Sequence, residues 1–259
     1  HYKLDVGLLQ PGDPADFIVV KDLQHFEVLQ TYVNGQLVAE KGESKMKIPV
    51  NDKSVTPVNN FHCTLKQPHE FAVIASPEAP DLMAIEALNE QLITNKVLVK
   101  STIAEGKIVG DVENDILKIV VINRYHDATV AKAFIKGFGL QKGAIASSVA
   151  HDSHNVVAVG VDDESICRAV NKIIEEKGGI SLIDGSHEAL LPLPVAGLMS
   201  SEDGYEVARD YARMDRLAKD LGSPLSAPFM TLSFMALLVI PHLKLSDKGL
   251  FDGDAFALV

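Results

Sequence analysis

Short runs of apolar residues separated by turn residues recur along most of the chain, and such runs predict β-strands. The clearest pair covers residues 144–149 and 156–161, with five polar residues between them. Because these two runs are apolar at nearly every position, we expect both faces of their sheet to be covered. The predicted strands lie at residues 71–75, 96–100, 118–123, 144–149, 156–161, 180–183 and 188–192.

Other segments repeat apolar residues every three or four positions, which predicts amphipathic helices. In the clearest of them, Ile166 and Val170 fall on one face, Asp162 supplies a carboxylate at the start and Gly178 follows the end. Its apolar face should pack on the sheet. The predicted helices lie at residues 81–93, 128–136, 163–177 and 204–221.

The chain divides near residues 43–60, a polar stretch with lysines and prolines that we interpret as a linker. Before it, residues 28–33 and 36–39 flank Asn34-Gly35, a pair typical of a β-hairpin turn. We therefore expect a domain boundary near residue 50, with a small β unit in residues 1–50 and a larger α+β domain in residues 51–259. In fold class the whole chain is α+β, with a mixed sheet flanked by helices.

Composition indicates a folded protein, since 47% of the 259 residues are hydrophobic. With 35 acidic and 24 basic residues the net charge is −11, which leaves no basic surplus to neutralise phosphates. We therefore expect neither a nucleic-acid partner nor an anionic membrane surface. The isolated Cys63 and Cys167 predict no disulfide framework and fit a reducing cytoplasm. No apolar run reaches the roughly 18 to 20 residues of a membrane span.

Five polar residues, His151, Asp152, Ser153, His154 and Asn155, interrupt the two buried strands. Burying imidazoles, a carboxylate and an amide without partners would cost several kcal/mol. Either these groups satisfy one another, as a closed polar turn, or they face a ligand. Two imidazoles are fewer ligands than a zinc site usually has, so we predict no metal site in this chain.

Two other features carry possible chemistry. Arg124 ends the apolar strand predicted at residues 118–123, which indicates either an ion pair at a domain interface or a contact to substrate. Gly137-Phe138-Gly139 resembles a glycine-rich phosphate-binding loop, but it follows a predicted helix and lacks the Lys-Ser/Thr ending of such loops. We therefore interpret the glycines as the stop of that helix and predict no phosphate site.

Whole phrases of the sequence resemble one enzyme family. Residues 7–12, 15–20 and 33–35 resemble the end of an amidohydrolase-superfamily chain, where the polypeptide leaves the metal-bearing barrel and completes a small β-sandwich. Later phrases resemble, in order, the C-terminal domain of bacterial-type adenine deaminase, so that the resemblance covers residues 6–252. These phrases occupy residues 123–125, 136–140, 143–146, 151–155, 191–199 and 228–241.

The resemblance implies a parent enzyme that hydrolyses adenine to hypoxanthine and ammonia with a metal-activated water. It implies a binuclear manganese or iron centre held by an N-terminal barrel, and a barrel needs about 200 residues or more. No His-x-His pair occurs in this chain, which begins at His1, so we expect a fragment that lacks the barrel, binds no cofactor and is inactive alone. On the same ground residues 1–50 are the last strands of the β-sandwich, and residues 51–259 are the adenine deaminase C-terminal α+β domain.

The resemblance also gives the polar residues a role. We expect His151, Asp152, Ser153, His154 and Asn155, with Arg124, to cap the barrel mouth and to touch adenine or the groups around it. A histidine exchanges protons near neutral pH, and an asparagine amide matches the N6/N7 edge of adenine. No catalytic residue is assigned within this chain.

Two other functions remain open at the level of sequence. The parent enzyme could be an amidohydrolase that acts on a different heterocyclic amine, since the residues that would read the substrate are not all in this chain. Alternatively, the region could be a non-catalytic module that stabilises the barrel or joins subunits, and we expect the parent to be a homo-oligomer.

Overall fold

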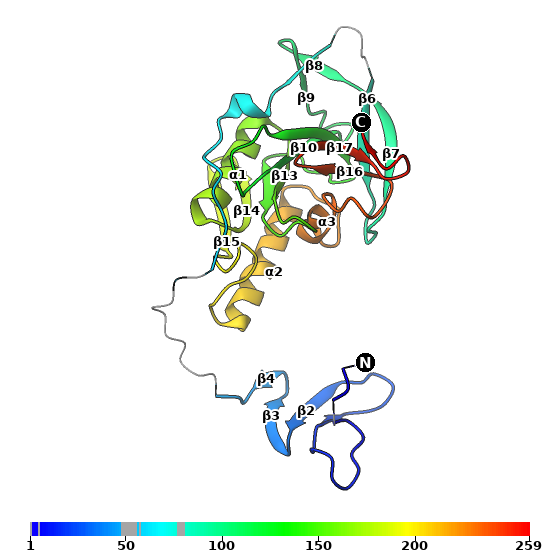
Figure 1. The fold of residues 1–259 in the computed structure, drawn as a ribbon, viewed down its shortest axis with the longest axis vertical. Helices are drawn as coiled ribbons and strands as arrows, with labels where there is room; N and C mark the ends of the chain where they lie inside the picture. The colour runs from blue at the N-terminus through cyan, green and yellow to red at the C-terminus, as the bar shows by residue number, and fades with distance from the viewer. Residues whose placement is uncertain (1, 5, 48–55, 57, 77–80) are drawn as a thin grey trace. The chain divides into compact units, whose positions relative to one another are not determined.

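The computed structural model describes residues 2–4, 6–47, 56, 58–76 and 81–259. The chain forms two compact units, residues 1–56 and residues 57–259, whose ribbons are drawn in Figure 1. Half of the linker predicted at residues 43–60, namely residues 48–55 and 57, lies outside the described residues. The combination of helices with several sheets confirms the predicted α+β class.

The smaller unit is a four-stranded antiparallel sheet in which neighbouring strands follow one another along the chain. Asn34 and Gly35 both have positive φ, +50° and +74°, as a two-residue turn of type I′ requires, and this confirms the predicted hairpin. The rings of Phe17 and Tyr32, directly opposite in the sheet, stack with centroids 4.6 Å apart. The strands are β1 (Phe17–Val20), β2 (Val28–Val33), β3 (Gln36–Glu40) and β4 (Glu43–Ser44).

An eight-stranded sheet runs through the larger unit in the order β15-β14-β12-β13-β10-β11-β6-β7. All its neighbours are antiparallel except β11 and β6. Its strands are β6 (Asp81–Ala87), β7 (Thr94–Lys100), β10 (Leu117–Ile122), β11 (Ala131–Lys136), β12 (Ala144–Ser147), β13 (Val156–Gly160), β14 (Gly179–Asp184) and β15 (His187–Pro192). The predicted strands at 96–100, 118–123, 144–149, 156–161, 180–183 and 188–192 are thus confirmed.

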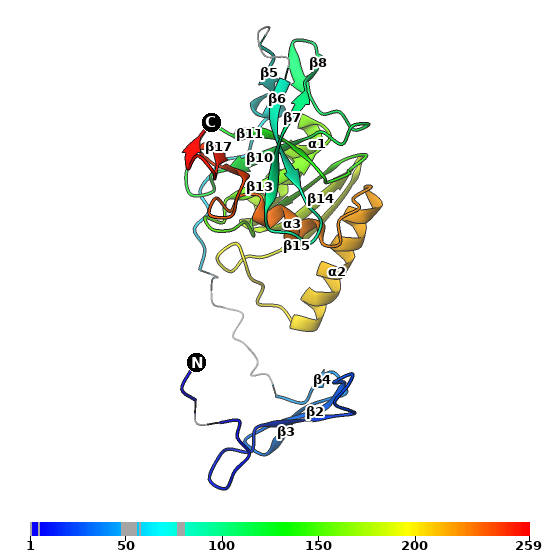
Figure 2. The same ribbon diagram turned by 90° about the vertical axis from the view of Figure 1, so that its right-hand side faces the viewer.

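Helices cover both faces of this sheet, as Figures 1 and 2 show. Helix α1 (Asp163–Glu176) packs in one core with Val120 and Ile122 of β10, whereas Ile119 and Val121 lie in the other core. That second core also holds buried residues of α2 (Gly204–Asp220) and α3 (Pro228–Phe234). Burial on both faces explains why the central strands are apolar at successive positions.

The helices predicted at 163–177 and 204–221 are confirmed. At the start of α1 the carboxylate of Asp162 accepts a hydrogen bond from the Ser165 N–H at 2.7 Å. At its end Lys177 adopts the left-handed conformation, and the Gly178 N–H reaches the Ile173 carbonyl at 2.9 Å. Asp203 caps α2 in the same way as Asp162 caps α1.

Two predicted helices are wrong. Residues 81–93 form β6 and the turn that leads into β7, and the segment predicted at 128–136 contains β11. The first segment is rich in Ala, Leu and Glu and the second in Ala and Lys, all residues with high helix propensity. Pairing with β10 and with each other overrides that local preference, because it completes the sheet over two cores.

Two small sheets and a short helix complete the larger unit. The sheet β16-β17-β18 contacts β11 of the main sheet. Residues 71–75, which were predicted as one strand, contain the end of a 3₁₀ helix and the short strand β5. The remaining elements are η1 (Pro68–Phe71), β5 (Val73–Ile74), β8 (Thr102–Ala104), β9 (Lys107–Val109), β16 (Leu243–Ser246), β17 (Gly249–Asp252) and β18 (Ala257–Leu258).

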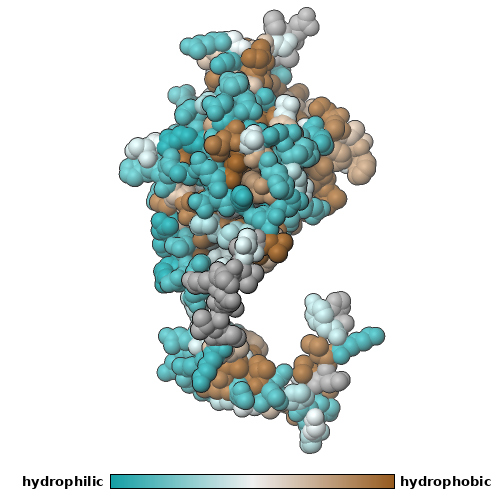
Figure 3. Space-filling model, turned by 60° about the vertical axis from the view of Figure 1, so that its left-hand side comes forward, coloured by the Kyte–Doolittle hydropathy of each residue, from teal (hydrophilic) through white to brown (hydrophobic). Residues whose placement is uncertain are grey.

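Hydrophilic residues cover much of the surface that Figure 3 presents, with smaller groups of hydrophobic residues between them. Exposed apolar side chains include Met230 on α3 and Val239 after it, which are 52% and 74% exposed. Among the described residues, no helix is long and apolar enough to cross a membrane.

Candidate functional site

The polar segment, residues 151–155, lies in the connection between β12 and β13 at one end of the main sheet. Ser148 anchors the main chain that leads from β12 into this segment. Its fully buried hydroxyl accepts a hydrogen bond from the Gly179 N–H at 2.8 Å and donates to the Gly197 carbonyl at 2.6 Å. Three chain segments that are distant in sequence therefore meet where the polar segment begins.

His151 is half-buried against α3. Its main-chain N–H donates to the Ser233 carbonyl at 3.0 Å, and its imidazole stacks on the ring of Phe234 with centroids 4.8 Å apart. The aromatic contact holds the imidazole plane in a defined orientation. No sequence pattern links residue 151 to residue 234, so this contact could not be predicted.

His154 is half-buried and has a φ of +51°, an unusual conformation for a non-glycine residue. Its ring meets that of His151 edge to face, with centroids 5.6 Å apart. The Nδ1 atom is buried and has no hydrogen-bond partner among the described residues. Burial lowers the pKa of His154 below its usual value, and the charges of His151 and Arg124 lower it further. This environment therefore favours the neutral form of the His154 imidazole.

Arg124 follows β10 and is only 4% exposed. Its Nη1 donates to the Ala196 carbonyl at 2.8 Å, and its Nη2 donates to the Tyr125 hydroxyl at 3.2 Å. The guanidinium lies over the Tyr125 ring, 4.9 Å from the centroid, a favourable cation–π distance. Within the described part of the chain Arg124 has no carboxylate partner, and its buried Nε has no hydrogen-bond partner.

The other candidate residues differ in exposure. Asn155 is 2% exposed, and its Oδ1 accepts a hydrogen bond from the Arg124 main-chain N–H at 3.2 Å. Ser153 is exposed, but its carbonyl accepts a hydrogen bond from the Tyr125 hydroxyl at 2.6 Å. Asp152 is also exposed. Arg124, His151, His154 and Asn155 are thus brought together, whereas the Asp152 carboxylate faces solvent.

Sequence reasoning missed Tyr125, Phe234 and Gly197 as members of this site. Tyr125 directly follows Arg124, so a polar aromatic residue beside a buried cation was a usable signal. Phe234 and Gly197 could not be found in this way, because only the fold brings α3 and the loop after β15 to the polar segment.

The arrangement combines one neutral imidazole that has an unpaired buried nitrogen with a second imidazole beside it. Asn155 Oδ1 accepts a hydrogen bond from the Arg124 main chain, but neither imidazole has a side-chain hydrogen bond among the described residues. A neutral imidazole can accept a proton at one nitrogen and donate at the other. The segment therefore offers hydrogen bonding and proton exchange to a neighbouring group.

A metal ion does not fit the described residues. They contain no group of three or more His, Cys, Asp or Glu side chains placed to hold one. His151 and His154 are two imidazoles without a third ligand, and Asp152 points to solvent. A metal centre would therefore need ligands from outside these residues.

The glycine-rich loop after β11 is already occupied by a carboxylate. The interpretation of Gly137 and Gly139 as the stop of a helix is wrong, because they follow a strand. Their main-chain N–H groups donate to the two oxygens of Asp115, both at 2.7 Å. Backbone donors that bind an internal carboxylate are not available to a phosphate.

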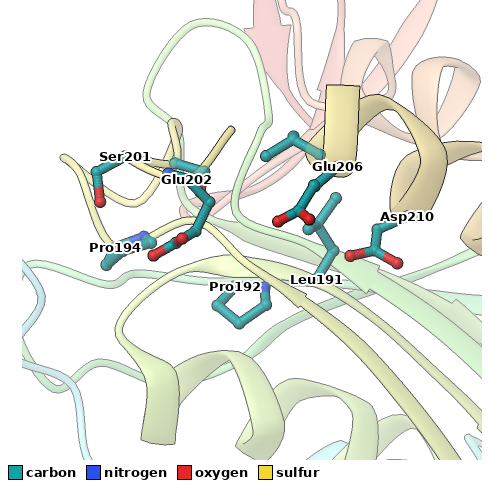
Figure 4. Close-up of a pocket in the computed structure, with 9 residues that line it drawn as sticks. Leu191, Pro192, Pro194, Ser201, Glu202, Glu206 and Asp210 are labelled. Carbon is teal, nitrogen blue, oxygen red and sulfur yellow. The ribbon is translucent and has the colours of Figure 1, made fainter. Parts of the chain in front are cut away.

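A separate cavity of about 230 Å³ lies beside α2, and its lining includes none of the six candidate residues. Figure 4 shows Glu206 and Asp210 projecting from α2 toward Leu191 and Pro192, with Glu202 across the hollow. The loop that contributes Glu202 follows β15, so it also contains the Ala196 carbonyl that binds Arg124.

These features define an α+β domain that presents a half-buried histidine pair at one end of a mixed sheet. Comparison with known proteins identifies the family to which this domain belongs. The family described as the adenine deaminase C-terminal domain matches residues 91–257, and the chain belongs to this family.

The similar proteins are all named adenine deaminase. The adenine deaminase of Salinibacter ruber is 51% identical over 261 residues, and that of Sulfurovum sp. is 50% identical over 260 residues. The adenine deaminase of Methanothermobacter thermautotrophicus is 40% identical over 258 residues. Each match covers 100% of this chain but only 46% to 48% of the relative. The chain thus spans about half the length of the curated relatives that it matches.

Proposed function

We propose that this chain is the C-terminal part of an adenine deaminase, which converts adenine and water to hypoxanthine and ammonia. The observation that carries this proposal is the identity of 40% to 51% over the whole chain to proteins named adenine deaminase. The remaining half of such a protein would be an N-terminal barrel that holds a binuclear manganese or iron centre and binds adenine. In this proposal residues 1–50 complete a β-sandwich of the barrel half.

The polar segment would cap the mouth of the barrel. Support comes from His154, whose lowered pKa favours the neutral imidazole and whose buried Nδ1 has no partner among the described residues, and from His151 beside it. Deamination requires proton transfer to the ring and to the leaving ammonia, and a neutral imidazole suits such a task. The exposed Asp152 lies next to His151 and would meet the barrel surface.

The chain's own contribution is to orient groups and to exclude water. The bound metal of the parent would activate the attacking water, and the described residues do not supply its ligands. We therefore infer that the isolated chain does not deaminate adenine. We further propose a homo-oligomeric, cytoplasmic enzyme of purine salvage that has no nucleic-acid or membrane partner, in keeping with the net charge of −11.

Hypoxanthine formation tests the proposal. The full-length protein, loaded with manganese or iron, should release hypoxanthine and ammonia from adenine, and this 259-residue chain under the same conditions should not. A panel of other heterocyclic amines serves as the control for substrate class. Turnover of another amine in preference to adenine would refute the substrate, and metal-dependent turnover by the chain alone would refute the inferred division of labour.

A second function is favoured by one observation. Arg124 and Asn155, two of the six candidate residues, form side-chain hydrogen bonds with other groups of this chain. That pattern supports a non-catalytic module that stabilises a barrel or joins subunits. Under this alternative, substitutions in the polar segment would change the stability or the assembly of the full-length protein but not its turnover.

A further inference from the structure

We propose that Arg124 and Tyr125 form a positioning clamp that sets the shape of the polar segment and thereby the orientation of His154. Neither residue would touch substrate. The catalytic consequence of this proposal rests on the proposed function, whereas its structural part concerns this chain alone.

Arg124 joins segments from three parts of the sequence. Its Nη1 binds the Ala196 carbonyl at 2.8 Å in the loop after β15, and its main-chain N–H binds Asn155 at 3.2 Å. Its own carbonyl accepts hydrogen bonds from the N–H groups of His62 at 2.7 Å and Cys63 at 3.2 Å. Because these donors and acceptors are bound to protein groups, Arg124 is built to hold loops together.

Tyr125 carries the link to the polar segment. Its hydroxyl accepts a hydrogen bond from Arg124 Nη2 at 3.2 Å and donates to the Ser153 carbonyl at 2.6 Å. The Arg124 guanidinium also lies over its ring. One oxygen atom therefore connects a buried cation to the main chain of the residue before His154.

The loop after β15 packs closely against the Arg124 guanidinium. A Cβ atom added at Gly197 would lie 2.0 Å from Arg124 Nη1, and Gly197 has a φ of +70°. The same glycine accepts the hydrogen bond of the buried Ser148 hydroxyl at the start of the connection. Both ends of the connection between β12 and β13 thus depend on one loop.

Arg124 and Tyr125 influence His154 in two ways, through its main-chain geometry and through its protonation. Tyr125 fixes the carbonyl of the preceding residue, and the His154 N–H donates to the Ala150 carbonyl at 2.7 Å, which closes the turn. In addition, the positive charge of Arg124 opposes protonation of His154. Geometry and charge can therefore be separated experimentally.

Three variants separate the two effects. Tyr125→Phe removes the hydroxyl and keeps the ring, Arg124→Lys keeps the charge and loses the forked contacts, and Arg124→Gln removes the charge. Tyr211→Phe on α2 removes a hydroxyl that is remote in sequence from the polar segment and serves as the matched control. All four are made in this 259-residue chain and in the full-length protein.

In the 259-residue chain, Tyr125→Phe should speed amide hydrogen exchange at His154 by roughly five- to tenfold, because the turn loses the hydrogen bond from the Tyr125 hydroxyl to the Ser153 carbonyl. Tyr211→Phe should leave this exchange unchanged. The pKa of His154, measured by NMR titration, should rise in Arg124→Gln and stay low in Arg124→Lys. Unchanged exchange in Tyr125→Phe would overturn the clamp, even if Arg124→Gln fails to fold.

In the full-length protein, Tyr125→Phe should lower kcat for adenine by roughly tenfold with little change in KM, since orientation rather than binding is lost. Equal kcat values for Tyr125→Phe and Tyr211→Phe, with faster His154 exchange in the former, would refute the catalytic consequence and leave the clamp standing. A full-length protein without deaminase activity would refute the proposed function, while the exchange results would still decide the clamp.

Discussion

Replacing Gly197 by alanine tests whether the packing around Arg124 matters for stability. Gly185 is a matched control, since its φ of +56° also favours glycine but its added Cβ would meet no atom within 4 Å. Both substitutions therefore incur the backbone cost of a left-handed alanine, about 1 kcal/mol. Only Gly197→Ala places a methyl group 2.0 Å from Arg124 Nη1.

The additional cost follows from the displaced guanidinium. Arg124 must give up the 2.8 Å hydrogen bond to the Ala196 carbonyl, and a hydrogen bond to a charged group contributes about 1.5–3 kcal/mol. We therefore expect Gly197→Ala to lower the free energy of unfolding of the larger unit by about 3 kcal/mol. Gly185→Ala should lower it by only about 1 kcal/mol.

Native-state hydrogen exchange at the amides of β10 measures this difference, because these buried amides report the opening of the larger unit alone. A difference of about 2 kcal/mol corresponds to roughly a thirtyfold faster exchange. In an Arg124→Met background the extra cost of Gly197→Ala should vanish. Equal exchange in Gly197→Ala and Gly185→Ala would refute the packing argument.

Three further predictions concern groups outside the clamp. Burial lowers the pKa of Lys244 to about 8, so the unfolded chain binds more protons between pH 8 and 10.5, and the unfolding free energy should rise across that range. Lys244→Met should abolish this rise in urea titrations at several pH values. Asp115→Ala frees two main-chain N–H groups and should cost about 2 kcal/mol in urea unfolding, whereas the exposed Glu113→Ala should cost almost nothing. Ser148→Ala leaves the Gly179 N–H buried without its partner and should lower stability by about 2 kcal/mol; an unchanged thermal midpoint would contradict this.

The central strands were predictable because strands that are buried on both faces have apolar residues at successive positions. Residues such as Val120 and Val121 face opposite cores, so a continuous apolar run follows directly from two covered faces. Helix α1 was predictable for a different reason, since Asp162 and Gly178 mark its two ends in the sequence. Local chemistry was enough in both cases.

The strands β6 and β11 could not be recognised by the same reasoning. Residues 81–87 contain Ala, Leu, Met and Glu, and residues 131–136 contain Ala and Lys, all of which also suit a helix. Their parallel pairing joins segments about fifty residues apart, and no local signal reports it. Tertiary pairing therefore decided their conformation.

The candidate site was predictable only in part. The polar residues 151–155 are conspicuous because they interrupt buried strands, and Arg124 because it ends one. Their relation to Tyr125 and to the loop that holds Gly197 depends on how three distant segments converge. The sequence alone therefore pointed to these candidate residues but not to the contacts that join them to Tyr125 and to the loop after β15.

The most direct test of the central proposal is the turnover of adenine by the full-length protein carrying His154→Gln. His187→Gln, which alters an exposed histidine at the start of β15, is the matched control. We expect His154→Gln to lower kcat at least tenfold without a change in unfolding free energy, and His187→Gln to leave kcat unchanged. Equal kcat values for the two variants would contradict a contribution of the polar segment to deamination.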